Sequence, residues 1–455
     1  MVQDILDAVE SQREAALEEL AAFLRIPSVS ADPQCAPEVR RCAEHAAERL
    51  RAAGLTAEVH PTPGHPAVLA ERIEDPSLPT VLIYGHYDVQ PPDPLDLWET
   101  DPFDPTVRGG YLFARGAHDN KGQIFCHLKA VEAFHRVRGR LPLNVKFLIE
   151  GEEEIGSPSL DGLMRAQAGR LKADYAVVSD TSQFAERIPA IMYGLRGLSY
   201  LEVVLTGPDR DLHSGGYGGS VDNPANVLLR VLASLRDEDG KVAIPGFYDD
   251  VAPLEDWERE AFAALPFDEA EYRRSIGVPA LAGEKGFSTL ERRWARPTLD
   301  VNGVYGGYQG PGAKTIIPSR AGAKVSMRLV PNQDPNRIND LFETAVRERL
   351  PRTVRVEITR YWGSRAVLID AHSRGMEAAR SALKKGFGRP PVLIREGGTI
   401  PVVASLQDIL GLDSLLVPFG GHDDRTHSPN ERMPLENIHR GVLTACHLLH
   451  ELSRI

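Results

Sequence analysis

Five places in the chain carry acidic or imidazole side chains of the kinds that bind divalent cations. His86, the Glu153–Glu154 pair and Asp180 each follow a short apolar run, and Asp119 and His427 stand apart from them. Open α/β sheets collect their ligands outside the carboxyl ends of the strands. Carboxylates and imidazoles gathered at one such edge suit divalent cations, so the pattern predicts a two-metal hydrolase.

The charges of these residues balance a pair of metals. Two divalent cations carry four positive charges, which Asp119, Glu154, Asp180 and one bound hydroxide would neutralise. One carboxylate would bridge the two metals, which lie about 3.5–4 Å apart in such sites. His86 and His427 would complete the ligand set as neutral imidazoles.

Two further acids have expected roles beside the metals. Glu153 and Glu154 are adjacent, so their side chains diverge and only one is expected to face the metals. The other can act as the general base on the metal-bound water and then pass the proton to the leaving amine. Asp88 lies two residues after His86 and can orient its ring.

Each feature taken alone also has a purely structural explanation. The run Gly85–Asp88 can be an ordinary turn, and the run Glu152–Glu154 can be solvated loop charges. Asp180 can cap the next helix, and His427 can be a surface histidine. Their common placement after strands favours a functional site.

Strands and helices are expected to alternate up to residue 188. The apolar spacing predicts helices over 3–25, 37–53 and 122–138, and strands over 80–84, 144–149 and 174–179. Pro27 ends the first helix, and Gly54 follows the second. This alternation is typical of a parallel or mixed sheet with helices on both faces.

From residue 189 the pattern changes. Strands are expected at 200–206, 323–329 and 354–358, helices at 225–235 and 336–350, and irregular structure at 236–297. In one strand, Val325, Met327 and Leu329 should point one way and Lys324, Ser326 and Arg328 the other. Helices on one face of a half-exposed antiparallel sheet form an α+β unit.

The first pattern returns in the last part of the chain, with a helix at 376–385, a strand at 415–417 and a helix at 438–452. Since His427 lies here and the other candidate ligands lie in the first part, the middle unit is best explained as an insertion. We therefore expect an α/β catalytic domain with a mixed sheet, built from residues 1–188 and 373–455. Residues 189–372 would form an inserted α+β lid.

Bulk properties disfavour some classes of function. The formal net charge is −12, which argues against a nucleic-acid partner because phosphate binding needs a basic surface. No apolar run is long enough for a membrane span, and the N-terminus lacks a secretion-signal pattern, so we expect a cytoplasmic protein. The four cysteines lack the spacing of a metal site, so we expect them to be reduced and buried. They are Cys35, Cys42, Cys126 and Cys446.

Several segments resemble the carnosinase-type dipeptidases, a branch of the metallopeptidase superfamily that also holds aminoacylases and desuccinylases. They cover most of the chain: residues 85–91, 115–122, 150–157, 179–180, 211–215, 306–315, 328–331, 395–401 and 427–431. Two positions depart from the resemblance, Ile155 and Thr399, where the branch often has a small polar residue and a serine. The departures leave the substrate preference open.

The resemblance implies a role for each candidate residue. One metal would be held by His86, Asp119 and Asp180, and the other by Asp119, Glu154 and His427, with Asp119 as the bridge. Glu153 would be the base, and Asp88 would tune His86. The substrate-binding positions would be His213, Thr315, Arg328 and Thr399, with His213 reaching the neighbouring subunit's site to polarise the scissile carbonyl.

Two of these positions can also be judged from the residues alone. Arg328 lies on the polar face of its strand, where a guanidinium can clamp a free carboxylate through two hydrogen bonds. The alternative for Arg328 is a salt bridge within the lid. The alternative for His213, which precedes Ser214 and two glycines, is a structural role in a turn.

The resemblance implies a metallodipeptidase that cleaves dipeptides or short peptides. It would bind two divalent metal ions per subunit, Zn²⁺ with Mn²⁺ or Co²⁺ as alternatives, and form a homodimer through a ferredoxin-like lid. Its partner would be a peptide substrate, with no nucleic acid or membrane. The alternatives are a deacylase of N-acyl amino acids on the same fold and a catalytically silent metal-binding protein. The presence of Glu153 argues against the silent protein, and the acidic charge argues against a metal-dependent nuclease.

Overall fold

The computed structural model describes residues 2–455, which divide into two compact units. The first unit contains the chain up to Tyr193 together with Ile369–Ile394 and Ser405–Ile455. The second unit contains Gly194–Leu368 and Arg395–Ala404. The chain therefore leaves the first unit twice, once for a long segment and once for a short one.

A mixed sheet forms the centre of the first unit, with the strand order β1-β2-β6-β3-β7-β17-β8. The central strands β6, β3, β7 and β17 are mutually parallel, and β1 and β2 are antiparallel at the edge. The strands are β1 (Thr56–His60), β2 (Ala67–Arg72), β3 (Thr80–His86), β6 (Asn144–Glu150), β7 (Tyr175–Val178), β8 (Ala190–Leu195) and β17 (Ser414–Leu416). Three short strands, β4 (Thr106–Arg108), β5 (Tyr111–Phe113) and β18 (Arg432–Pro434), form a separate sheet.

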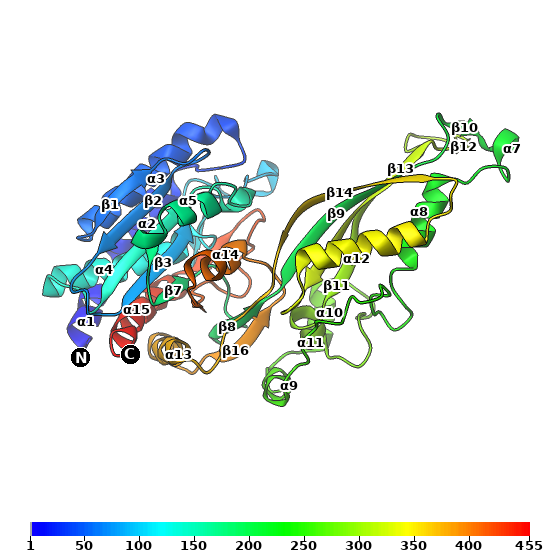
Figure 1. The fold of residues 1–455 in the computed structure, drawn as a ribbon. Coiled ribbons are helices and arrows are strands. Elements are labelled where there is room, and N and C mark those ends of the chain that lie inside the picture. Colours follow the sequence, from blue (N-terminus) through cyan, green and yellow to red (C-terminus); the bar gives the residue numbers. More distant parts are fainter. Residues whose placement is uncertain (1) are drawn as a thin grey trace. The chain divides into compact units, whose positions relative to one another are not determined.

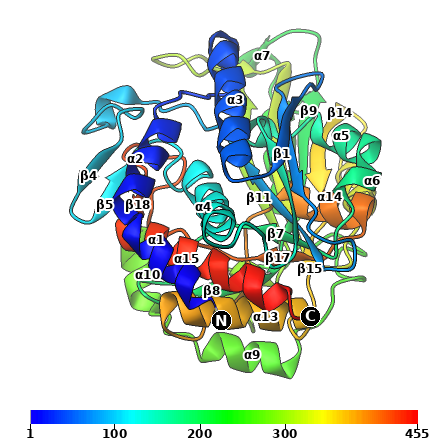
Figure 2. The same cartoon turned by 90° about the vertical axis from the view of Figure 1, so that its left-hand side faces the viewer.

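Helices cover both faces of the mixed sheet. Figure 2 shows α4 and α15 on one side of the sheet and α5 and α6 on the other. The helices are α1 (Gln3–Ser11), α2 (Arg13–Leu24), α3 (Ala36–Ala52), α4 (Lys121–Arg138), α5 (Leu160–Ala166), α6 (Ala168–Leu171), α13 (Arg374–Phe387) and α15 (Leu435–Leu452). Two further elements, α14 (Pro401–Leu410) and β16 (Val392–Glu396), span the limits of the two units.

The predicted α/β architecture is confirmed, and burial explains why its central strands were visible in the sequence. Every residue of β6 is buried, and so is every residue of β3 after Thr80. Strands covered on both faces need continuous apolar runs, which the sequence provides. The single helix predicted over 3–25 is wrong, because Gln12 leaves the helical conformation (φ −110°, ψ 9°) and separates α1 from α2.

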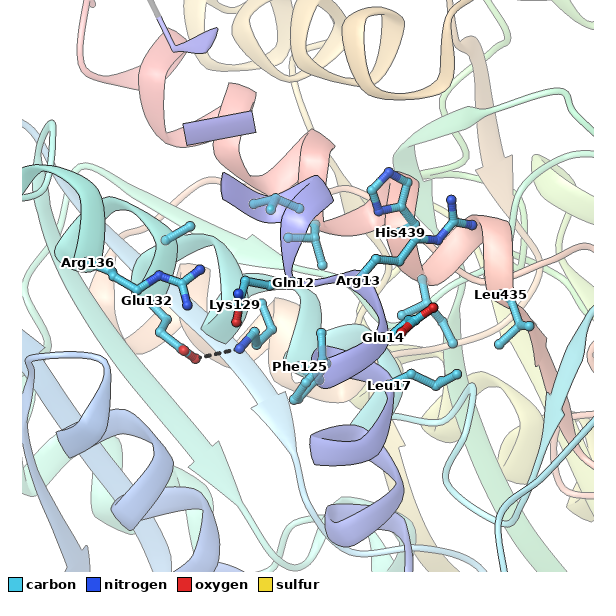
Figure 3. Close-up of a pocket in the computed structure, with 15 residues that line it drawn as sticks. Gln12, Arg13, Glu14, Leu17, Phe125, Lys129, Glu132, Arg136, Leu435 and His439 are labelled. Atoms are coloured by element: carbon cyan, nitrogen blue, oxygen red, sulfur yellow. Dashed lines mark hydrogen bonds and ion pairs between the residues drawn. The ribbon is translucent and has the colours of Figure 1, made fainter. Parts of the chain in front are cut away.

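A cavity of about 240 Å³ lies between the N-terminal helices and helices α4 and α15 (Figure 3). Its wall is mainly apolar, with Val9, Leu17 and Phe125 among the lining side chains, and the Lys129–Glu132 ion pair lies along it. None of the candidate metal ligands lines this cavity. It lies in the helical layer and is separate from the site described below.

The second unit is built on an antiparallel sheet in the order β11-β13-β9-β14. Its hydrophobic core contains Val325, Met327 and Leu329, all fully buried, together with apolar side chains of two helices. Lys324 is exposed and Arg328 half-buried, as the predicted alternation requires, but Ser326, predicted on the same polar face, is buried. The elements are β9 (Gly197–Thr206), β11 (Thr298–Gly306), β13 (Arg320–Leu329), β14 (Arg355–Ser364), α8 (Pro224–Ala233) and α12 (Pro335–Glu348).

Four short elements complete the second unit at the ends of its sheet. They are β10 (Leu212–His213), β12 (Ile316–Ile317), α7 (Ser214–Tyr217) and β15 (Val367–Leu368). β10 pairs with β12, and Figure 1 shows this pair beyond one end of β9 and β13. β15 pairs with the last two residues of β8.

The prediction that residues 236–297 are irregular is wrong in part. This segment contains α9 (Asp256–Ala263), α10 (Glu269–Ser275) and α11 (Thr289–Trp294). Reciprocal hydrogen bonds between Ser288 and Glu291 cap α11, and the Asp268 side chain caps α10. These side chains satisfy backbone N–H groups at the starts of helices too short to show a clear apolar period.

Two further predictions were that the four cysteines are reduced and buried and that the chain has no membrane-spanning helix. Cys42, Cys126 and Cys446 are free and buried, whereas Cys35 is only half-buried, so the prediction of a buried thiol is wrong at Cys35. Among residues 2–455, no helix combines the length and the apolar character that crossing a bilayer requires.

Candidate metal centre

His86 ends β3 and points its ring toward two carboxylates. Its Nε2 atom lies 3.0 Å from Oδ1 of Asp119 and 3.6 Å from Oδ2 of Asp180. Its Nδ1 atom lies 3.1 Å from the backbone oxygen of Asp88. A carbonyl oxygen can only accept a hydrogen bond, so Nδ1 carries a proton and the lone pair of the neutral ring lies on Nε2.

The carboxylates of Asp119 and Asp180 favour a positive charge at Nε2 of His86. Burial lowers the pKa of His86, but the carboxylates of Asp180, Asp119 and Asp88 raise it and outweigh burial, so this pKa lies well above its ordinary value. The buried Nε2 atom nevertheless has no hydrogen-bond partner of acceptable geometry among the described residues. A divalent cation bound between His86, Asp119 and Asp180 would take the place of this proton.

His427 completes a second group from the far end of the sequence. Its Nε2 atom lies 2.9 Å from Oδ2 of Asp119 and 3.3 Å from Oε2 of Glu154. Hydrogen bonds to these two carboxylates raise the pKa of His427 to about 10. Its backbone is in the left-handed region (φ 61°), which is uncommon for residues other than glycine and is found at functional sites.

Two groups of three potential ligands therefore meet at Asp119. In each of the groups His86–Asp119–Asp180 and Asp119–Glu154–His427, the ligand atoms lie within 4.8 Å of one another. A buried carboxylate oxygen, Oε1 of Glu154, has no hydrogen-bond partner in the described chain. These nitrogen and oxygen donors fit two divalent cations, with one oxygen of Asp119 toward each group.

Glu153 lies beside both groups but belongs to neither. It begins a short 3-10 turn, Glu153–Ile155, directly after β6 and its Gly151–Glu152 extension. Burial raises the pKa of Glu153 well above its ordinary value, and the nearby carboxylates of Asp180 and Asp119 raise it further while His86 opposes them. A carboxyl group in this position can exchange protons with a water molecule at the metals.

Asp88 connects the histidine to the glutamate pair. Its carboxylate oxygens accept hydrogen bonds from the backbone N–H groups of Glu153 (3.2 Å) and Glu154 (3.1 Å), and from the hydroxyl of Ser30 (2.7 Å). Oδ1 of Asp88 also lies 3.4 Å from Nδ1 of His86. The buried Asp88 thus holds the loop that carries both glutamates against the ring that it orients.

Sequence reasoning missed three residues that fix the candidate ligands. The side-chain amide of Asn120 donates to Oδ1 of Asp180 (2.7 Å), and that of Gln90 donates to Oε2 of Glu154 (2.8 Å). The third is Glu431, whose carboxylate accepts from the backbone N–H of Asp119 (3.1 Å). Their only signal was their place next to motif residues, because the contacts themselves join distant parts of the chain.

Glu431 anchors the whole loop that presents Asp119. It is completely buried and forms an ion pair with Arg115 at 2.7 Å. Its two oxygens also accept from the backbone N–H groups of Gly116 (3.1 Å) and His118 (2.9 Å). The loop therefore keeps its shape through one carboxylate supplied by the last part of the chain.

Replacing Glu431 with alanine is expected to destabilise the metal-free protein by about 3–5 kcal/mol, because it leaves the buried charge of Arg115 without a partner. The midpoint of urea unfolding would measure the loss. Glu436→Ala is the control, since this largely exposed acid pairs with Arg13 on the surface and should cost at most about 1 kcal/mol. Equal losses in both variants would contradict the anchoring role.

The substrate-binding candidates lie in the second unit and form two pairs. His213 pairs with Ile316 in the β10–β12 ladder, and the carbonyl of Thr315 accepts from the N–H of Ser214 (3.1 Å), so His213 and Thr315 are neighbours. Arg328 donates to the hydroxyl of Thr399 at 2.8 Å. Arg328 makes no salt bridge within residues 2–455, so the alternative of a lid salt bridge is not what the structure contains.

Comparison with known proteins identifies the family. The model of peptidase family M20/M25/M40 matches residues 82–451. The chain belongs to this peptidase family. The expected similarity to carnosinase-type metallopeptidases is thereby confirmed, and the chain is a peptidase of the hydrolase class.

This M20 peptidase is similar to named relatives over most of its length. It is 33% identical to the Cys-Gly metallodipeptidase dug1 of Schizosaccharomyces pombe, over 99% of this chain and 98% of that protein. It is 36% identical to human Beta-Ala-His dipeptidase, over 86% of this chain and 78% of that protein. The solved structure of the M20 metallo-carboxypeptidase Sso-CP2 from Sulfolobus solfataricus superposes with a TM-score of 0.88 at 33% identity, covering 97% and 99% of the two chains.

Proposed function

We propose that this M20 peptidase is a dipeptidase with two metals per subunit. The observation that carries the proposal is the meeting of two ligand groups at Asp119, with Glu153 beside both. His86 and Asp180 would complete one metal site, and Glu154 and His427 the other. The relatives named as dipeptidases support a dipeptide as the substrate.

The reaction divides between the metals and the side chains of the chain. A pair of divalent cations lowers the pKa of water toward about 7 and polarises a carbonyl group. Glu153 takes the proton of the attacking water as the new carbon–oxygen bond forms. It returns this proton to the amine nitrogen as the carbon–nitrogen bond breaks. Asp88 fixes the positions of Glu153 and His86 relative to each other through its contacts with the N–H of Glu153 and with Nδ1 of His86.

The two pairs of substrate-binding candidates would act on different parts of the substrate. Arg328, held by Thr399, would bind the C-terminal carboxylate, for which a guanidinium is well suited. His213 and Thr315 would act at the scissile carbonyl. The Nδ1 atom of His213 accepts from the N–H groups of Gly215 (3.0 Å) and Gly216 (3.2 Å), so its Nε2 atom carries the proton and can donate to a developing oxyanion.

The spacing of these pairs supports a homodimer. Arg320 and Arg328 lie about 26 Å apart along β13 at the usual rise of a strand, and His213, which pairs with Ile316, lies beyond the Arg320 end. An extended dipeptide spans only about 7 Å. This separation favours a second copy, docked through the lid, as the source of His213 for the site that contains Arg328.

Replacing His213 with alanine is expected to lower kcat by about 10²–10³-fold, the usual loss for one oxyanion donor, with little change in metal content. Steady-state kinetics on a dipeptide would measure the change. Mixing His213→Ala with Arg328→Ala should restore part of the activity, because a mixed dimer has one site with both residues intact. An effect confined to KM, or no recovery on mixing, would contradict the role of His213 across a dimer.

Several finer properties belong to the same proposal. Zn²⁺ is the expected metal, with Mn²⁺ or Co²⁺ able to use the same nitrogen and oxygen ligands. The protein would act in the cytoplasm. Residues 1–188 and 373–455 would form the catalytic domain, and residues 189–372 the lid that also makes the dimer contact.

The function is tested by comparing substrates on the metal-loaded protein. Dipeptides, N-acyl amino acids and peptides of four or more residues would be hydrolysed side by side with each metal. A dipeptidase should show its highest kcat/KM on dipeptides. Preference for N-acyl amino acids would indicate the deacylase instead, and preference for long peptides would indicate a carboxypeptidase like the Sulfolobus relative. Binding without any product would indicate a silent metal-binding protein.

A further inference from the structure

A strongly basic cavity lies in the second unit of this otherwise acidic chain. Its volume is about 540 Å³, and its wall contains six arginines but only two carboxylates, those of Glu284 and Asp300. The six arginines are Arg196, Arg236, Arg292, Arg293, Arg296 and Arg328. The wall of this cavity therefore has an excess of positive side chains, whereas the whole chain has a net charge of −12.

Strand register explains how three of these arginines come together. Arg196 immediately precedes β9, Arg328 is the second-last residue of β13, and Arg296 lies two residues before β11. These three strands are neighbours, and Arg328 pairs with Thr298 on one side and Leu198 on the other. Adjacent strands are about 4.8 Å apart, so all three guanidinium groups start from one end of the sheet.

Among the described residues 2–455, Arg296 is the only one of the six arginines with a carboxylate partner. Arg296 binds Glu284 through two hydrogen bonds of 2.8 and 2.7 Å. Within the described part of the chain, Arg196 donates to the backbone oxygens of Gly397 (3.0 Å) and Arg296 (3.4 Å) alone, and Arg292 to that of Glu284 (2.8 Å) alone.

Arg293 and Arg236 also lack a carboxylate partner among the described residues. Arg293 lies over the ring of Tyr272, and Arg236 donates only to the backbone oxygen of Gly240. Neither forms an ion pair with a carboxylate in the part of the chain that the structure describes. Burial and the nearby charge of Arg328 lower the pKa of Arg196 to about 10, although Glu396 and Asp300 oppose this. The repulsion among these cations is therefore only partly relieved.

We propose that this cavity binds a ligand with at least two anionic groups, carboxylates or phosphates, through Arg196, Arg293 and Arg328. Guanidinium groups bind such oxyanions through paired, charge-assisted hydrogen bonds. The proposed function gives Arg328 one carboxylate to bind, and that leaves Arg196 and Arg293 for a second anionic group.

Two sources can supply the second anionic group. One is an acidic side chain of the substrate, which rests on the proposed dipeptidase function. The other is a small free dianion that binds the lid whether or not a peptide is present. Both share the same chemistry, and direct binding measurements followed by kinetics tell them apart.

The binding experiment uses the full-length, metal-loaded protein and calorimetry with glutarate, a dicarboxylate, against acetate, a monocarboxylate. Glutarate should bind at least about tenfold more tightly than acetate. Arg293→Gln should weaken glutarate about tenfold, the effect expected for one charge-assisted hydrogen bond. The matched control is Arg230→Gln, because Arg230 is exposed on α8 and does not line the cavity. Equal binding of the two acids, or equal effects of both variants, would overturn the proposal.

Arg236→Gln provides a second variant, at an exposed arginine of the same wall. The positive charge of Arg236 adds to the attraction for a dianion without contacting it, so its loss should weaken glutarate more than acetate. If Arg293→Gln fails to fold, this variant keeps the proposal testable. An unchanged affinity for glutarate in a folded Arg236→Gln protein, together with equal binding of the two acids, would reject the site.

Kinetics identify the source of the anion. If the substrate supplies it, kcat/KM for Ala-Glu should exceed that for Ala-Gln by about tenfold, and Arg293→Gln should abolish this ratio. If a free anion supplies it, the ratio should be near one and glutarate should change the rate on Ala-Gln. A protein that hydrolyses no dipeptide but still binds glutarate would refute the proposed function and leave the anion site standing.

Discussion

Replacing Glu153 with alanine is expected to lower kcat by about 10²–10⁴-fold while the protein keeps both metals. The carboxylate lies beside both ligand groups and belongs to neither, so its removal should take away proton transfer without emptying the sites. Steady-state rates on a dipeptide and metal analysis of the same sample would measure the two effects separately. A variant with a nearly normal rate would remove Glu153 from the mechanism.

Glu154→Ala is the matched comparison, because it removes the same chemical group from the adjacent position. Glu154 lies 3.3 Å from His427, and its buried Oε1 atom has no hydrogen-bond partner among the described residues, so this variant should lose metal as well as activity. The contrast separates a base from a ligand. If both variants lost the same amount of metal, the assignment of roles within the pair would be wrong.

Asp119→Ala is expected to abolish binding of both metals together with activity. Asp119 is the residue common to the two groups, and its Oδ1 and Oδ2 atoms face His86 and His427 respectively. In the unaltered protein, metal at one hundred times its Kd should stabilise the fold by about 2.7 kcal/mol. The variant should show none of this stabilisation, which a shift of Tm on adding Zn²⁺ or Mn²⁺ would measure.

Single-site variants give the comparison for Asp119. Asp180→Ala and His427→Ala each alter one ligand group and should each lose one metal and keep part of the stabilisation. Metal content and Tm shift can be measured on all three proteins under the same conditions. An Asp119→Ala protein that still binds two metals would refute the bridging role.

The strands at the centre of the first unit could be predicted from the sequence because one rule, burial on both faces of the sheet, determines their composition. β3, β6 and β7 are apolar because helices cover both faces of the sheet, so their carboxyl ends and the side chains that follow could be located. The break between α1 and α2 was missed, because the apolar spacing continues through Gln12. The cap formed by Ser288 and Glu291 was visible as a motif, but the helix behind it is only six residues long.

The supporting residues of the candidate site could not be predicted for a different reason. Asn120 contacts Asp180 across 60 positions, and Glu431 contacts Asp119 across 312 positions. Local propensity carries no information about such pairs, which arise only when the whole unit packs. The basic cavity was missed in the same way, because its arginines come from the residue before β9, from the end of β13 and from the segment 236–297.

The position of His427 has a consequence for biosynthesis. It contacts Asp119 across 308 positions, and Glu431, which fixes the Asp119 loop, lies still nearer the C-terminus. A ribosome that adds 5–20 amino acids per second needs roughly 15–60 s to go from one contact partner to the other. During that time the acidic side chains of the first part of the chain lack His427 and Glu431, so complete loading with two metals would have to wait until residues 427–431 have been synthesised.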